Sequence, residues 1–327
     1  MQTTSSVLMI RPVNFGFNPQ TAANNLFQKE GFGINAAEAA VKEFDNFVKL
    51  LQDNGVNVTV AQDTPDPHTP DSIFPNNWFS THSDGTLVLY PMFAENRRLE
   101  RKPHVIEKIK ENFNVKRIVD LTGWEKKGEF LEGTGSMILD RENRLVYACS
   151  SPRTSEKVLE QFCDEMDYEY LLFDSFDSAG NPVYHTNVMM CVGSDFVVAC
   201  LDSIRDIQQR ESFINQVEDS GKELIEISLE QMDNFAGNML EIRGGDTGIA
   251  KNSGSANSPG VANSQGSVNS GKGRPLLVMS KRAKESLEKY QLLRLESYCS
   301  ILAPSLTVIE NNGGGSARCM IAELFVS

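Results

Sequence analysis

The chain has 327 residues, of which 40% are hydrophobic and 23% charged, the composition of an ordinary globular protein. Its formal net charge of −13 argues against a protein whose main partner is the phosphate backbone of a nucleic acid. No apolar run approaches the roughly 18 residues that a membrane helix needs, and the first residues lack a secretory signal pattern. The six cysteines form no CxxC pair and no metal-type spacing with the four histidines. We therefore expect a cytoplasmic protein with reduced cysteines, no metal, and neither a membrane nor a nucleic-acid partner.

Helix-like and strand-like segments alternate along the chain. Five segments carry the one-sided apolar pattern of helices: residues 35–55, 98–113, 155–166, 203–221 and 280–299. Between them lie pairs of strand-like runs joined by turn residues, namely 84–85, 141–143 and 193–195. The sequence therefore predicts an α/β fold.

Five polar segments, called elbows below, each lead into a strand pair. They are residues 71–77, 132–136, 185–187, 237–241 and 313–319. The elbows begin 61, 53, 52 and 76 residues apart, and the last spacing falls to about 49 once the segment 247–273 is set aside. This near-constant period indicates five ββαβ units, none of which buries its apolar face alone. A closed ring of the five units would bury those faces and bring the elbows to its centre.

The segment 247–273 consists almost entirely of Gly, Ser, Asn and other small residues. Such a composition cannot bury enough apolar surface to offset the entropy of ordering. A linker between two domains is the alternative, but the chain after residue 273 is too short for a free-standing domain. We therefore expect one catalytic domain over residues 1–327, with a disordered insertion at 247–273.

The elbows resemble those of the pentein, or guanidino-group modifying, superfamily, which includes arginine deiminases, dimethylarginine dimethylaminohydrolases and amidinotransferases. The matching motifs are Asp71-x-x-Phe74, Glu132-Gly-x-Gly, His185 and Gly313-Gly-Gly-x-x-Arg-Cys319. The N-terminal strings MIRPVNFGFNP and TAANN and the pair Arg97-Arg98 are most similar to the citrulline-utilisation hydrolases (citrulline ureidases). The resemblance implies the pentein α/β-propeller, with five modules in a pseudo-fivefold ring around a central active site.

The elbow residues also form a reasonable catalytic set. A guanidinium or urea carbon resists water, so a covalent step on a strong nucleophile divides one hard reaction into two easier ones. Cys319 would be that nucleophile, with a thiouronium or S-carbamoyl adduct, and His185 would transfer protons as acid and base. Glu132 would orient the reacting group by charge-assisted hydrogen bonds, and Asp71 would anchor the substrate. The resemblance adds Phe74 to the substrate-binding residues.

Three arginines are candidates to hold a substrate carboxylate by paired hydrogen bonds: Arg97, Arg98 and Arg243. Each is equally compatible with a surface ion pair. The other five cysteines are expected in the core. Because the chain has no phosphate-binding glycine motif attached to a strand, we expect no nucleotide and no other cofactor.

Two asparagines point to the substrate. In arginine deiminases, the elbows resembling 71–77 and 185–187 both end in Asp, and these carboxylates bind a cationic guanidinium. Here the positions are Asn77 and Asn187, which offer N–H donors to a neutral ureido oxygen. This favours citrulline, hydrolysed to ornithine, ammonia and carbon dioxide.

Several alternatives remain open at this level. Arginine deiminase or dimethylarginine dimethylaminohydrolase activity would use the same residues, and so would an amidinotransferase that passes the Cys319 adduct to an amine. A non-enzymatic binding protein on the same scaffold is disfavoured because Cys319, His185 and Glu132 are all present. The sequence leaves open whether copies of the chain form a homo-oligomer.

Overall fold

The computed structural model describes residues 1–22, 24–25, 27–29, 36–245 and 273–325. The described strands form five three-stranded sheets, and helices connect them, so the α/β class is confirmed. Across these ranges, no helix is long and apolar enough to cross a membrane. Residues 247–272 of the expected insertion lie outside the described residues.

Four of the sheets are built from consecutive stretches of chain and share one strand pattern. The first two strands pair antiparallel, and the third pairs parallel with the second after a helical crossover. The strands are β3 (Phe79–Thr81), β4 (Thr86–Leu89) and β5 (Arg117–Asp120); β6 (Met137–Asp140), β7 (Leu145–Cys149) and β8 (Glu169–Phe173); β9 (Met190–Val192), β10 (Phe196–Ala199) and β11 (Glu223–Glu226); β12 (Leu240–Gly244), β13 (Arg274–Val278) and β14 (Ser300–Leu302). This is the ββαβ order that the repeat predicts.

The fifth sheet combines both ends of the chain. β15 (Ala322–Leu324) pairs antiparallel with β1 (Ser6–Arg11), and β1 pairs parallel with β2 (Asn57–Gln62) after α2 (Ala36–Asp53). The strand pattern is therefore the same as in the other four sheets, although the first strand comes last in the sequence.

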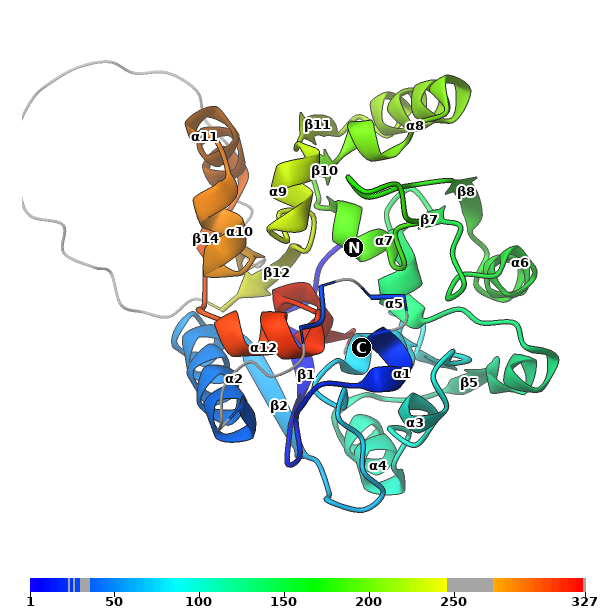
Figure 1. Cartoon of the computed structure of the whole chain (residues 1–327), viewed down its shortest axis with the longest axis vertical. Coiled ribbons are helices and arrows are strands. Elements are labelled where there is room, and N and C mark those ends of the chain that lie inside the picture. Colours follow the sequence, from blue (N-terminus) through cyan, green and yellow to red (C-terminus); the bar gives the residue numbers. More distant parts are fainter. Residues whose placement is uncertain (23, 26, 30–35, 246–272, 326–327) are drawn as a thin grey trace, which may run out of the picture.

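Neighbouring sheets contact one another in chain order. β15 contacts β3, β3 contacts the short helix α5 (Gly133–Ser136) that precedes β6, β6 contacts β9, and β9 contacts β12. The last unit contacts the first through the Arg243 amide on β12, which donates to the carbonyl of Thr4 over 2.9 Å. Figure 1 shows the short helices α5, α7 (Thr186–Met189) and α12 (Thr307–Gly313) toward the middle of the molecule.

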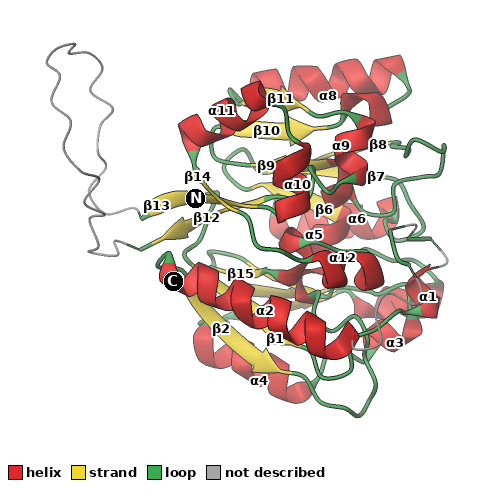
Figure 2. Ribbon diagram, turned by 60° about the vertical axis from the view of Figure 1, so that its left-hand side comes forward, coloured by secondary structure: helices red, strands yellow, loops and turns green. Residues whose placement is uncertain are grey.

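The longer helices lie on the outside, as Figures 1 and 2 show. Each buries one apolar face; in α2 the buried residues are Ala40, Phe44, Phe47, Val48 and Leu51. The other long helices are α4 (Pro103–Asn112), α6 (Glu156–Met166), α8 (Ile207–Asp219) and α11 (Lys289–Tyr298). Shorter helices are α1 (Pro19–Ala22), α3 (Glu95–Arg98), α9 (Leu229–Asp233) and α10 (Lys281–Ser286).

Three predicted helices differ from the structure at their ends or in their continuity. The segment 98–113 is helical only at Arg98, where α3 ends, and from Pro103 to Asn112, because Pro103 occupies the first turn of α4 and starts a new helix there. The segment 203–221 is helical only from Ile207, where the Asp206 side chain caps α8 by accepting from the amide of Gln209. The segment 280–299 is divided into α10 and α11, with Glu288 capping the second helix.

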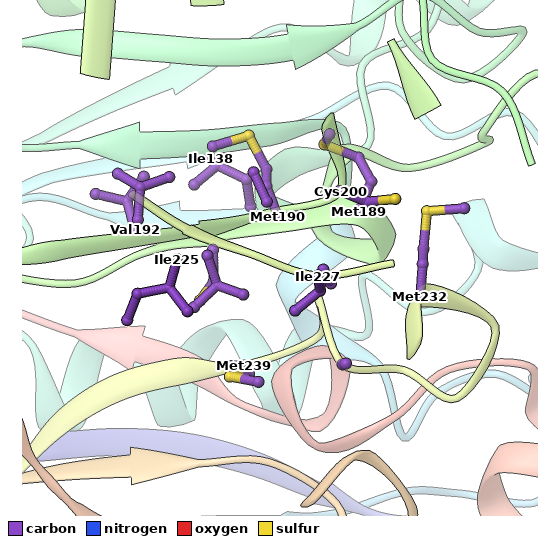
Figure 3. Packing of buried hydrophobic residues seen from close by; sticks show 14 of the residues in the cluster. Ile138, Met189, Met190, Val192, Cys200, Ile225, Ile227, Met232 and Met239 are labelled. Carbon is purple, nitrogen blue, oxygen red and sulfur yellow. The ribbon is translucent and has the colours of Figure 1, made fainter. Parts of the chain in front are cut away.

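Adjacent units share their hydrophobic core. In Figure 3, Ile138 from β6, Met190 and Val192 from β9, Ile225 from β11 and Met239 next to β12 pack in one cluster. All six cysteines are buried and free, which confirms the core positions predicted for Cys149, Cys163, Cys191, Cys200 and Cys299. Because each unit completes its neighbour's core, the elbows between the units are held in fixed relative positions.

Candidate active site

Most of the predicted site residues line one small cavity between the elbows. Residues from the first, third and fifth elbows surround it together with the N-terminal segment 21–28: Asp71, Phe74, Asn77, His185, Gly313, Gly314, Gly315, Cys319, Thr21, Asn25 and Gln28, joined by Arg97, Arg153 and Tyr184. The cavity measures about 20 Å³, which is room for about one water molecule. Glu132 and Asn187 adjoin it through hydrogen bonds to His185 and Cys319.

Two asparagine side chains converge on the predicted nucleophile. Cys319 lies in the 3₁₀ turn η4 (Ala317–Met320) and is 5% exposed. Nδ2 of Asn187 lies 3.5 Å from its Sγ, and Nδ2 of Asn238, from the fourth elbow, lies 3.3 Å away. Asn238 Oδ1 accepts from the Arg318 amide, 3.0 Å away, so its amide group is oriented with the nitrogen toward sulfur. The sulfur can therefore accept from both amide nitrogens, and its thiol can also donate to Asn238 Oδ1, 3.8 Å away.

The glycine run before Cys319 lets the backbone approach other site residues closely. A Cβ atom on Gly313 or Gly315 would lie 2.8 or 2.9 Å from the Phe74 ring. Gly314 has φ +63°, in the left-handed region that favours glycine. The predicted function of this run, close approach and unusual conformation, therefore has a structural basis.

His185 and Glu132 form a buried pair with Arg153 beside it. Nε2 of His185 lies 2.7 Å from Oε2 of Glu132, and Nη1 of Arg153 lies 3.4 Å from the same oxygen. Burial lowers the pKa of His185 to about 4, although the Glu132 carboxylate opposes this, so the imidazole is neutral at pH 7. Burial alone would raise the pKa of Glu132, but Arg153, His185 and Arg97 outweigh it and lower that pKa, so the carboxylate stays ionised.

Asp71 is held by the N-terminal segment and presents one free oxygen. Its Oδ2 accepts from Asn18 Nδ2 at 2.7 Å and from Thr21 Oγ1 at 3.0 Å. Burial raises the pKa of Asp71, against the opposing effect of Arg97 and of these two hydrogen bonds.

Three buried polar atoms at the cavity are unpaired. Among the described residues, Asp71 Oδ1, Asn77 Nδ2 and Asn187 Oδ1 have no hydrogen-bond partner. Leaving a buried polar atom unpaired is unfavourable by roughly 1–3 kcal/mol, and such atoms are rare in native proteins. One acceptor and one donor at this small cavity, Asp71 Oδ1 and Asn77 Nδ2, with a second acceptor beside it, Asn187 Oδ1, therefore indicate a binding site for a polar ligand.

The three candidate arginines have different surroundings. Arg97 is 2% exposed and lines the cavity; Nη1 donates to Asn77 Oδ1 over 2.7 Å. Arg98 does not line the cavity and donates to the carbonyls of Met92 and Phe93. Arg243 lies on β12, where it donates to the Thr3 hydroxyl and the Gly273 carbonyl, also away from the cavity.

A family model described as "N,N dimethylarginine dimethylhydrolase, eukaryotic" matches residues 11–326. The chain belongs to this family. The superfamily resemblance of the elbows is thereby confirmed. No curated protein sequence matches the chain.

Solved structures of this fold cover almost the whole chain. Apo ArgZ, an arginine dihydrolase from cyanobacteria, has a TM-score of 0.71 at 16% identity, over 98% of this chain and 41% of its own. An AgrE mutant in complex with L-arginine has a TM-score of 0.71 at 17% identity, over 98% of this chain and 40% of its own. A dimethylarginine dimethylaminohydrolase mutant from Pseudomonas aeruginosa, in complex with citrulline, has a TM-score of 0.63 at 13% identity, over 98% of this chain and 99% of its own. The chain thus spans about two fifths of the length of ArgZ and AgrE.

The site of this dimethylarginine dimethylhydrolase family member includes residues that the sequence did not reveal. Arg153 pairs with Glu132, and its Nη2 donates to the carbonyl of Thr21 at 2.9 Å, yet it lies outside every elbow. Asn238 lies within the fourth elbow, which had no assigned role, and its place in the repeat was the only signal for it. Nothing in the sequence singles out Arg153, because its partners are distant in the chain.

No metal site accompanies these groups: nowhere in the described ranges do three His, Cys, Asp or Glu side chains form a group that could hold a metal ion. The arrangement offers a thiol with two amide donors, a neutral imidazole paired with an ionised carboxylate, and two guanidinium groups on the cavity wall. These are the groups that covalent hydrolysis at a carbon bonded to nitrogen requires.

Proposed function

We propose that the protein is a cysteine-dependent hydrolase that cleaves a C–N bond of a ureido amino acid, with citrulline as substrate and ornithine, ammonia and carbon dioxide as products. The observation that carries the proposal is the orientation of the Asn77 amide. Arg97 has only donors, so the Asn77 oxygen must face its Nη1, 2.7 Å away. Asn77 Nδ2 is therefore the group left free at the cavity.

A free N–H donor suits a ureido group better than a guanidinium. The ureido oxygen accepts hydrogen bonds, and its N–H groups can donate to Asp71 Oδ1 and Asn187 Oδ1. A guanidinium has only donors, so one of its N–H groups would meet the Asn77 N–H without a bond between them. An unpaired donor in a buried site is unfavourable.

The proposed reaction proceeds in two steps. Cys319 Sγ attacks the ureido carbon while His185 takes the thiol proton and passes it to the leaving nitrogen, which departs as ammonia. The resulting S-carbamoyl adduct is attacked by a water molecule that loses a proton to His185. The carbon–sulfur bond breaks, the thiol regains its proton, and the carbamate loses carbon dioxide to leave ornithine.

The substrate carboxylate would be held by Arg97 and Arg153, the two guanidinium groups that line the cavity. Arg98 and Arg243 do not line it, so we do not assign them this role. Glu132 would act through His185, to which it is bonded at 2.7 Å, and Phe74 would pack against the substrate chain.

A guanidino substrate is the second candidate. The family model takes its description from dimethylarginine, AgrE was crystallised with L-arginine, and the Asp71 and Glu132 carboxylates would suit a cation. The deciding experiment measures kcat/KM for citrulline, arginine, methylarginines and agmatine, with ammonia, methylamine and ornithine as readouts. The ureido proposal expects the highest value for citrulline; a value for any guanidino compound at least tenfold above that for citrulline would replace it. Addition of an amine acceptor to the same assay tests amidino transfer.

The proposal extends to the arrangement of the units. We propose that the five units form one closed, pseudo-fivefold ring and a single catalytic domain, with residues 247–273 as an insertion. The contacts between successive sheets and between the last and first units support this. The cytoplasmic location stays a prediction.

An Asn77→Asp variant tests the role of the free amide. The new carboxylate would pair with Arg97 and remove the N–H donor, so we expect kcat/KM for citrulline to fall at least tenfold. The measurement is steady-state ornithine release. Unchanged kcat/KM would show that Asn77 does not contact the ureido oxygen.

A further inference from the structure

Glu100 lies outside the cavity but binds the arginine that borders it. The carboxylate accepts from Arg97 Nε at 2.8 Å and from Arg97 Nη2 at 3.0 Å, which is a two-point, parallel contact. Glu100 is 2% exposed, and Arg97 is the cation paired with it.

Arg97 has a second carboxylate within reach. Its Nε lies 4.0 Å from Asp71 Oδ2, and Nη1 and Nη2 also donate to Asn77 Oδ1 and the Phe74 carbonyl. Burial opposes the charge on Arg97, but Glu100, Asp71 and Glu132 outweigh it and raise its pKa, so the guanidinium stays charged. A buried cation between two carboxylates must pair closely with at least one of them.

Which atoms of the cavity stay unpaired depends on whether Arg97 pairs with Glu100 or with Asp71. With Arg97 on Glu100, Asp71 Oδ1 stays free and the Asn77 amide is fixed with Nδ2 unpaired. If Arg97 moved to Asp71, the guanidinium would occupy the substrate-anchoring carboxylate and release the Asn77 oxygen, leaving that amide free to rotate.

We propose that Glu100 is a positioning residue that keeps Arg97 away from Asp71, and so maintains the one acceptor and one donor that bind the substrate's polar groups. The role of those two atoms rests on the proposed function; the position of Arg97 does not. Glu100 acts only through Arg97 and does not line the cavity.

The test compares Glu100→Gln, which removes the charge at nearly constant size, with Glu100→Asp, which keeps it. Asp140→Asn is the matched control, because Asp140 is a fully buried carboxylate 3.7 Å from the buried Lys222 and does not line the cavity. The assay uses citrulline or arginine, whichever gives the parent its higher kcat/KM. With that substrate we expect Glu100→Gln to raise KM and to lower kcat/KM at least tenfold. Glu100→Asp should recover part of this loss, and Asp140→Asn should stay within about twofold of the parent in KM.

A crystal structure of the Glu100→Gln variant without substrate provides a readout that does not need turnover. We expect Arg97 to pair directly with Asp71. The proposal would be overturned if the Arg97 guanidinium still contacts the side chain at position 100. It would also be overturned if the folded variant has a KM within twofold of the parent's. If the parent turns over neither compound, the proposed function fails, and the position of Arg97 in the variant still decides the role of Glu100.

Discussion

The imidazole of His185 is positioned to accept a proton rather than to hold one. Burial lowers its pKa to about 4, and the Glu132 carboxylate 2.7 Å from Nε2 only partly offsets this. A neutral imidazole that lines the same cavity as Cys319 suits the proposed role of accepting the proton that this thiol loses on attack. Glu132 fixes the ring and stabilises the imidazolium that then forms, while Arg153 keeps Glu132 ionised.

Replacing the nucleophile should separate catalysis from folding. In Cys319→Ser or Cys319→Ala we expect turnover to fall at least 1000-fold, because no other thiol lines the cavity among the described residues. The serine variant differs by one atom at a site that is 5% exposed, so its Tm should stay within a few degrees of the parent. The measurements are ammonia release and thermal unfolding. Activity within tenfold of the parent would remove the proposed mechanism.

The low pKa of His185 also makes the folded state sensitive to acid. Between pH 6.5 and 4 the unfolded chain binds a proton at His185 that the folded chain does not, so stability falls as pH is lowered through this window. The expected loss from this group is about 2–3 kcal/mol between pH 7 and 4.5. Urea unfolding of the parent and of His185→Gln at both pH values measures it.

The loss of stability must be compared between the parent and the His185→Gln variant, because other groups also titrate in this range. Buried carboxylates such as Glu310, whose pKa burial raises, increase the stability as pH falls. Equal losses in the parent and the His185→Gln variant would contradict the assignment.

At the scale of elements, the site depends on one-turn helices that end where strands begin. Glu132 and His185 are the residues immediately before α5 and α7, and these helices run directly into β6 and β9. Each of these two side chains is thus attached to the start of a buried hairpin. The rigidity of the hairpins fixes His185 in the cavity wall and Glu132 behind it.

Gly135 in α5 tests how tightly these elements pack. A Cβ atom there would overlap Asn77 Nδ2 and would lie 2.9 Å from Cε1 and Nδ1 of His185. In Gly135→Ala we expect kcat/KM to fall by about 100-fold, because displacements of about 1 Å have effects of that size. Gly123→Ala is the control, because nothing lies within 4 Å of its added Cβ. The measurement is kcat/KM from steady-state kinetics. A Gly135→Ala variant as active as the control would mean that α5 does not set the geometry of the His185–Glu132 pair.

The elements were predictable from sequence to different degrees for physical reasons. The hairpin turns and the apolar faces of α2 and α6 leave clear periodic signals. The four-residue helices α5 and α7 are too short to show any period, and the start of α4 depends on Pro103. The convergence of Cys319, His185, Glu132 and Asp71 was predictable because each lies in a repeated elbow. Arg153 was not, because its partners are distant in the chain. Glu100 was not, because its pairing with Arg97 three residues earlier cannot be told from an ordinary surface ion pair in the sequence.

On the scale of the whole molecule, the segment that we propose as an insertion joins two strands that could be connected by a short turn. Gly244 at the end of β12 pairs with Arg274 at the start of β13, so the two strands are already aligned where residues 246–272 connect them. A short Gly/Asn turn could therefore join them as a hairpin. The effect of a long loop on closure entropy is small.

We expect a variant with a short turn in place of residues 247–272 to retain its Tm within a few degrees and its kcat/KM within about twofold. Thermal unfolding and ornithine release are the measurements. A large loss of Tm would show that the segment belongs to the fold, whereas a loss of activity at unchanged Tm would show that it contributes to the site.

The sheet formed by β15, β1 and β2 has a consequence for protein synthesis. Of the strands in the five sheets, β1 is made first, whereas its antiparallel partner β15 and the proposed nucleophile Cys319 follow the strands of the other four sheets. During translation the nascent chain therefore exposes an unpaired edge on β1 before the Cys319 thiol can reach the cavity. Of the strands in the five sheets, β15 is made last, and the segment that contains it both covers that edge and supplies the Cys319 sulfur. A chain that stopped before Cys319 would therefore lack both the proposed nucleophile and the strand that closes the fifth sheet.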